Sequence, residues 1–174
     1  MSRSLVIAVL LAMALCPGRA GAQAAASLQE LLAFRRCPLA ANLKAVYERP
    51  AWPEAGRQFV AVRVEGAPHS YVRCRIGGRR DPQLYCEASS LPFAMPQEGT
   101  AQASARTALA RLGFATETTG KDFPCRRPLD GAPDFDAIAT LMLTALHDGY
   151  GVRADTVLII EAPFAGPFVS VCRY

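Results

Sequence analysis

Residues 71–88, which read YVRCRIGGRRDPQLYCEA, decide the fold. Apolar and polar residues alternate on both sides of the central GGRRDP, as in two strands that each bury one face. The glycines and the proline between them favour a turn. The stretch therefore predicts a β-hairpin with one buried face and one face that carries arginine and tyrosine.

Two cysteines of the hairpin bear on its register. Cys74 and Cys86 are equidistant from residue 80, the midpoint of the turn. In an antiparallel pair they face each other on the same side of the sheet, within reach of a disulfide. We therefore predict a Cys74–Cys86 bridge as the preferred one.

The segments around the hairpin predict a small α+β domain. Strands are predicted at residues 57–64, 70–76, 83–88, 156–161 and 168–173, with one more within 114–127. Helices are predicted at residues 27–36 and 39–48, which Pro38 separates, at 100–112, and at 134–149, where Asp134 is the cap. Consecutive strands between groups of helices favour a single antiparallel sheet, a meander plus C-terminal strands, with the helices packed on one face.

The N-terminal residues have the layout of a secretory signal peptide. Arg3 precedes an apolar run at residues 5–15, and small residues follow at 20–24. The run is shorter than the roughly 20 residues that span a bilayer, and cleavage is expected after Ala22 or Ala24. Cys16 would permit a lipoprotein signal, but Leu15 stands where that signal requires a small residue. We therefore expect residues 1–24 to be a signal peptide and residues 25–174 to be one domain, periplasmic or secreted, with no stable membrane insertion after cleavage.

Three further cysteines of the mature chain leave a pairing open. They are Cys37, Cys125 and Cys172, of which two could form a second bridge while the third stays unpaired. The spacing does not decide which two pair.

The sequence lacks the motifs of common catalytic and metal sites. It has no Cys-x-x-Cys, no Gly-x-Ser-x-Gly, no phosphate-binding glycine loop and no His-Glu-x-x-His. The formal net charge of +4 is too small to indicate a nucleic-acid partner. We therefore predict no enzymatic activity, no metal, no cofactor and no nucleic-acid binding.

The polar face of the hairpin is the first candidate binding surface. Its candidate residues are Tyr71, Arg73, Arg75 and Tyr85, with two more arginines at 79–80. Arginine side chains bind carboxylates and phosphates through paired N–H groups. The alternative is that these charges only keep an exposed sheet face soluble and prevent edge pairing.

Two apolar loops are the second candidate surface. Residues 91–96 contain Phe93, and residues 162–168 contain Phe164. Exposed loops of this kind bind extended hydrophobic segments. The alternative is that both loops fold back on the core.

Four segments carry a resemblance to a known family: YVRC at 71–74, LYCEASS at 84–90, LARLGF at 109–114 and IATLMLTALHDGYG at 138–151. They resemble bacterial proteins with the TY-Chap domain, relatives of type III secretion chaperones and of YbjN, over roughly residues 57–161. The resemblance implies an α+β fold, a peptide-binding or chaperone-like role and, as in many secretion chaperones, a homodimer. It implies no catalytic residues. The basic charge, the signal peptide and the cysteines distinguish this chain from cytosolic secretion chaperones, which favours a periplasmic binding role over escort of an effector.

We therefore expect an exported, non-enzymatic protein that binds peptide or protein segments across its sheet and apolar loops. Two alternatives stay open. One is an enzyme or enzyme inhibitor that applies the arginine face to an anionic group, and the other is a structural envelope protein without a binding role.

Overall fold

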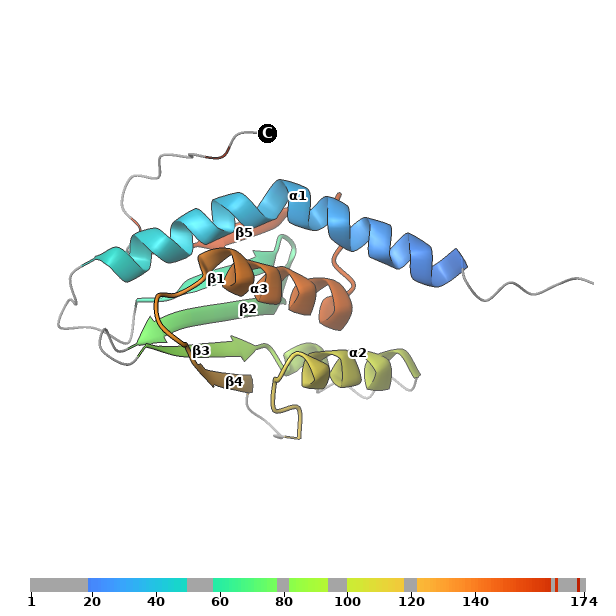
Figure 1. The fold of residues 1–174 in the computed structure, drawn as a ribbon. Helices are drawn as coiled ribbons and strands as arrows, with labels where there is room; N and C mark the ends of the chain where they lie inside the picture. The colour runs from blue at the N-terminus through green and yellow to red at the C-terminus, as the bar shows by residue number, and fades with distance from the viewer. Residues whose placement is uncertain are drawn as a thin grey trace, which may run out of the picture.

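A computed structural model describes the backbone of residues 19–49, 58–77, 82–93, 100–117, 122–163, 165 and 172. Within these ranges, three α-helices and a five-stranded sheet form two layers (Figure 1). The elements in chain order are α1 (Arg19–Glu48), β1 (Val60–Val64), β2 (Ala67–Gly77), β3 (Gln83–Ala88), the short 3₁₀ helix η2 (Leu91–Phe93), α2 (Thr100–Arg111), β4 (Phe123–Pro128), α3 (Phe135–Tyr150) and β5 (Leu158–Glu161). None of the described helices combines the length and the hydrophobicity that a membrane span requires.

The sheet is antiparallel throughout, in the order β4-β3-β2-β1-β5. Strands β2 and β3 form the hairpin that the sequence predicts, with Cys74 directly opposite Cys86. Val72 and Cys74 are buried, whereas Arg73 and Arg75 between and beyond them are exposed. This alternation gives the sheet one face toward the core and one toward solvent. The predicted α+β fold, with an antiparallel meander and helices on one face, is confirmed.

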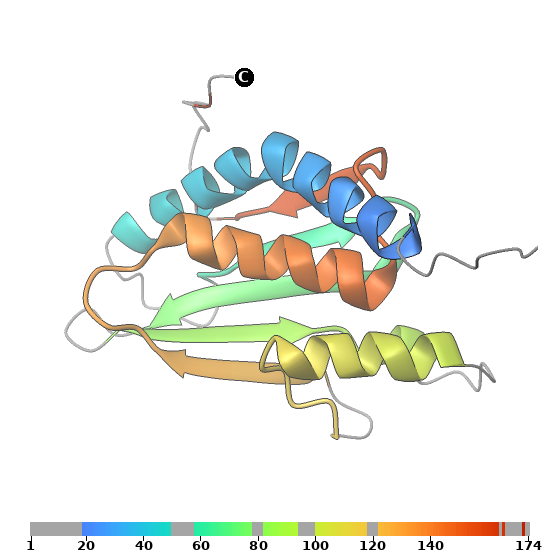
Figure 2. The same cartoon turned by 45° about the vertical axis from the view of Figure 1, so that its right-hand side comes forward.

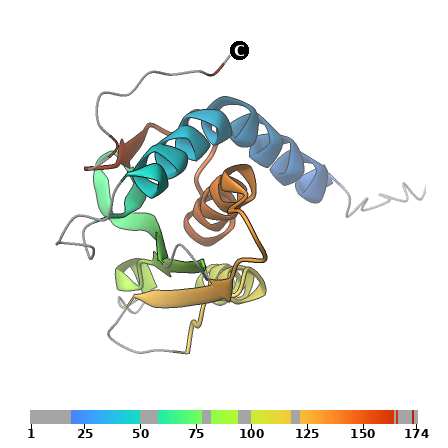
Figure 3. The same cartoon turned by 60° about the vertical axis from the view of Figure 1, so that its left-hand side comes forward.

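The core lies between the sheet and the helices α1 and α3, which lie side by side on one face of it (Figures 2 and 3). Helix α2 packs beside α3 (Figure 2). The two helices pack closely where Gly149 of α3 faces Leu109 of α2. A Cβ atom added at Gly149 would lie only 2.7 Å from Cδ2 of Leu109. The largest fully buried side chains are Leu31, Leu39, Val60, Val62, Val72, Leu109, Phe123, Met142, Leu143 and Leu146.

Helix α1 corrects the prediction of two helices separated at Pro38. It is one helix from Arg19 to Glu48 with Pro38 inside it. A proline in a helix interior costs about 3 kcal/mol, so the helix continues only where burial offsets this cost. Leu31, Leu39 and Leu43 lie on one stripe of α1 across the proline, and all three are buried. The side-chain amide of Asn42 also donates to the carbonyl oxygen of Pro38 at 2.8 Å.

The other predicted elements have clear local causes in the structure. The side chain of Asp134 accepts a hydrogen bond from the backbone N–H of Ala137 and caps α3, which ends at Gly151 in a left-handed conformation with φ of 69°. The strand predicted within 114–127 is β4, at the edge of the sheet beside β3. Strand β5 pairs with β1 at the other edge. The strand predicted at 168–173 lies outside the described residues.

Candidate functional site

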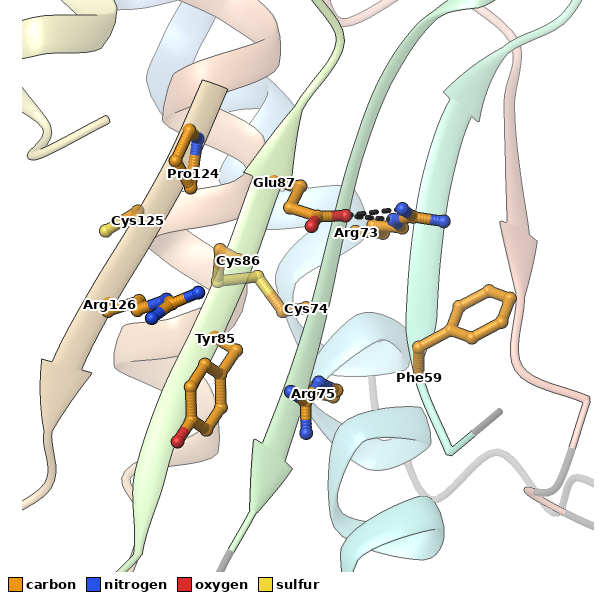
Figure 4. Close-up of a pocket in the computed structure, with 10 residues that line it drawn as sticks. All are labelled: Phe59, Arg73, Cys74, Arg75, Tyr85, Cys86, Glu87, Pro124, Cys125 and Arg126. Carbon is orange, nitrogen blue, oxygen red and sulfur yellow. Dashed lines mark hydrogen bonds and ion pairs between the residues drawn. A yellow bond between two sulfur atoms is a disulfide. The ribbon is translucent and has the colours of Figure 1, made fainter. Parts of the chain in front are cut away.

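The sheet face that points away from the helices carries the candidate site (Figure 4). Helices α1 and α3 pack on the opposite face, so neither of them covers it (Figure 3). We call this surface the outer face and define it by the outward side chains of β1 to β4. A hollow of about 430 Å³ lies on it. The hollow is lined by Phe59, Arg73, Cys74, Arg75, Tyr85, Cys86, Glu87, Pro124, Cys125 and Arg126.

Two arginines of the outer face are neutralised by carboxylates of neighbouring strands. Arg73 of β2 lies 2.5 Å from the carboxylate of Glu87 in β3, and Arg63 of β1 lies 2.5 Å from that of Glu161 in β5. Burial alone would lower the pKa of Arg73, but the hydrogen bond to Glu87 and its negative charge outweigh burial and raise that pKa. The charge of both arginines is therefore balanced by carboxylates of adjacent strands in the same sheet.

A second row of the outer face carries unbalanced positive charge. Arg75, Tyr85 and Arg126 are directly opposite one another on β2, β3 and β4. The guanidinium carbon of Arg75 is 4.2 Å from the centre of the Tyr85 ring, and that of Arg126 is 5.8 Å from it. Both distances are in the range of cation–π attraction. No carboxylate among the described residues forms an ion pair with either arginine.

The structure brings together three of the candidate residues from the sequence. Arg73, Arg75 and Tyr85 line the same hollow. Tyr71 does not line it, and its hydroxyl donates to the carboxylate of Asp122 just before β4. Burial, followed by this hydrogen bond, raises the pKa of Tyr71 to about 12, so its hydroxyl stays protonated and structural.

The remaining candidates lie outside the described residues. They are the side chain of Phe93, Phe164, and the two arginines at 79–80. Sequence reasoning missed Arg126, because the expected strand within 114–127 had no predicted neighbour in the sheet. The alternation of Cys125 and Arg126 was the available signal, since a buried cysteine at 125 directs residue 126 to the outer face.

Three cysteines lie next to the row of Arg75, Tyr85 and Arg126, one residue away along each strand. Cys74, Cys86 and Cys125 are directly opposite one another across β2, β3 and β4, and all three are buried. Cys74 and Cys86 form a disulfide with their sulfur atoms 2.01 Å apart, and Cys125 is a free thiol. A second disulfide joins Cys37 of α1 to Cys172, with 5.8 Å between their Cα atoms. Within the described ranges, no cluster of histidine, cysteine or acidic residues is placed to hold a metal ion.

Comparison with known proteins agrees with this architecture. Neither a curated protein nor a solved structure matches the chain significantly. A family model described as "T3SS (YopN, CesT) and YbjN peptide-binding chaperone 3", or TY-Chap3, matches residues 38–164. This range includes all five strands, helices α2 and α3 and the whole outer face. Since the match covers most of the 174 residues, the chain belongs to the TY-Chap3 family.

Proposed function

We propose that this protein is exported and that it binds extended peptide or protein segments on the outer face of its sheet without catalysing a reaction. The observation that carries the proposal is a sheet face that α1 and α3 leave uncovered, with a hollow over its central strands. The family description, which names peptide-binding chaperones, supports the same role.

The hydrogen bonding of the sheet favours binding on the face over strand addition at the β4 edge. Strands β2 and β3 each have a strand on both sides, so their backbone groups are already engaged. At the β4 edge, Pro124 and Pro128 lack the N–H group that an added strand would need. The carbonyl oxygen of Pro124 also accepts a hydrogen bond from the N–H of Ala115 at 2.8 Å. Compared with strand addition at β4, recognition by the side chains of the outer face is therefore favoured.

Export is supported by the N-terminal sequence and by the cysteines. Residues 1–24 have the charge, apolar run and small residues of a signal peptide. Two disulfides suit an oxidising compartment, since thiols are kept reduced in the cytosol. Intact mass of the protein from its own host, alkylated before reduction, tests this directly. A chain that starts at Gln23 or Ala25 with two bridges and one alkylated thiol is expected, and a full-length chain with every thiol alkylated would contradict export.

Peptide binding is tested with a matched pair of aromatic substitutions on opposite sides of the molecule. Tyr85 lines the hollow on the outer face, whereas Phe34 is 57% exposed on helix α1. Peptides selected from an unstructured library should bind the mature protein, and Y85S should weaken binding while F34S should not. Binding weakened equally by both variants would indicate nonspecific apolar contact. A screen that yields no binder would favour the alternative of a structural envelope protein.

A further inference from the structure

The row formed by Arg75, Tyr85 and Arg126 specifies the ligand further. Resting on the proposed function, we infer that the outer face selects acidic peptide segments, whose carboxylates are bound by the exposed guanidinium groups of Arg75 and Arg126 on either side of the Tyr85 ring (Figure 4). The two groups come from strands on either side of β3 and approach the same aromatic ring, at 4.2 and 5.8 Å from its centre. The ring holds both guanidinium groups in place, so less side-chain entropy is lost when a carboxylate binds.

The charge distribution of the outer face favours an anionic group at this row. Arg63 and Arg73 already have carboxylate partners at 2.5 Å, so they offer little net charge to a ligand. Arg75 and Arg126 have no such partner among the described residues, and both are exposed. A carboxylate of a bound peptide would supply the missing negative charge with little desolvation cost.

An apolar residue in the ligand would complement this contact. Val60 is directly opposite Cys74, so Phe59 precedes β1 at the level of Arg75. Phe59 lines the same hollow and lies across Arg75 from Tyr85 in Figure 4. The best ligand therefore combines an acidic side chain over the arginines with an apolar side chain near Phe59.

Other occupants fit the row less well. A second copy docked by a twofold axis through this row would place identical guanidinium groups against one another, and like charges repel. Nucleic acid binding relies on exposed aromatic rings for base stacking and on many phosphate contacts. Here the ring of Tyr85 is already contacted by two guanidinium groups, and only two arginines of the described outer face lack a carboxylate partner.

The test is fluorescence anisotropy with a labelled, unstructured peptide that contains glutamates and leucines, compared with the same peptide carrying glutamine for glutamate. The acidic peptide should bind at least tenfold more tightly at low salt, and the difference should shrink as ionic strength rises. R75Q and R126Q should each weaken its binding by about fivefold, the upper range for an exposed ion pair. R63Q is the matched control, since it removes one positive charge from the same face at an arginine already paired with Glu161, and it should change binding less than twofold.

The outcomes separate this inference from the proposed function. Equal binding of the acidic and neutral peptides, unchanged in R75Q and R126Q, would overturn the acidic preference and leave peptide binding intact. An R63Q variant as weak as R75Q would also overturn it, because the effect would then follow net charge alone. Displacement of the acidic peptide by a much lower concentration of a single-stranded oligonucleotide would identify nucleic acid as the partner. Binding of no peptide of either kind would refute the proposed function together with the inference.

Discussion

Replacing both cysteines of one disulfide by alanine should cost more stability at Cys37–Cys172 than at Cys74–Cys86. The two bridges differ mainly in the length of chain that they close, 135 residues against 12. A crosslink stabilises a protein largely by restricting its unfolded chain, and the restriction grows with the logarithm of loop length. That relation gives about 5.0 kcal/mol for the long loop and about 2.8 kcal/mol for the short one at 25 °C. The difference of about 2 kcal/mol depends only on the ratio of the two lengths.

Equilibrium unfolding in urea, without reductant, measures how much free energy of unfolding each double variant loses. The paired variants are C37A/C172A and C74A/C86A. Cys74 and Cys86 are almost fully buried, so their replacement also removes packing in the core. C125A measures that packing loss alone, because Cys125 is a buried free thiol in the same row of the sheet. Twice the free energy of unfolding lost by C125A is therefore subtracted from the free energy lost by C74A/C86A, and the remainder is compared with the loss in C37A/C172A.

An entropic origin of the difference would be contradicted if C37A/C172A lost no more free energy of unfolding than C74A/C86A after the packing correction. Such a result would mean that the long bridge restricts the unfolded chain less than its length implies, or that it destabilises the folded state. A rise in the urea dependence of the unfolding free energy should accompany the loss of the long bridge, since the uncrosslinked chain exposes more surface.

Three further predictions concern the helices and the pH dependence of stability. Gly149→Ala should lower the free energy of unfolding by about 1–3 kcal/mol, because the added Cβ would lie 2.7 Å from the side chain of Leu109; in urea unfolding, the loss should be smaller when Leu109→Ala is already present. Asp134→Ala should cost about 1 kcal/mol by removing the N-terminal cap of α3, whereas Asp134→Asn should retain most of that stability in the same assay. Raising the pH from 10 to about 12 should lower the free energy of unfolding, since the pKa of Tyr71 is raised from 10.0 to about 12 and the stability linked to a raised pKa is lost across that window. The urea midpoint of Tyr71→Phe should fall less steeply over this range, with the remaining fall due to Tyr150, whose pKa burial also raises.

The hairpin could be predicted because its information is local. Alternation within residues 71–88 fixes which side chains face the core, and the spacing of Cys74 and Cys86 around the turn fixes the register. The caps of α3 are equally local, since Asp134 and Gly151 act on the turns next to them. These features depend on contacts between residues that are near in sequence.

The features that could not be predicted depend on contacts between segments that are distant in sequence. Pro38 locally favours a break, and only burial of α1 against the other elements keeps the helix continuous across it. Cys37 and Cys172 are 135 residues apart, so only the fold shows which of the three remaining cysteines pair. Arg126 joins the outer face because β4 pairs with β3 after the intervening helix α2, and no sequence pattern gives that pairing.

The row of cysteines across β2, β3 and β4 gives Cys86 two cysteines with which a bridge across the sheet would be geometrically close. Cys86 has a cysteine directly opposite it on each neighbouring strand, Cys74 on β2 and Cys125 on β4. A chain that enters an oxidising compartment from its N-terminus delivers Cys74 and Cys86 well before Cys125. If the protein is exported as proposed, Cys74 would therefore be available to Cys86 before Cys125, the other cysteine that faces it in the folded sheet.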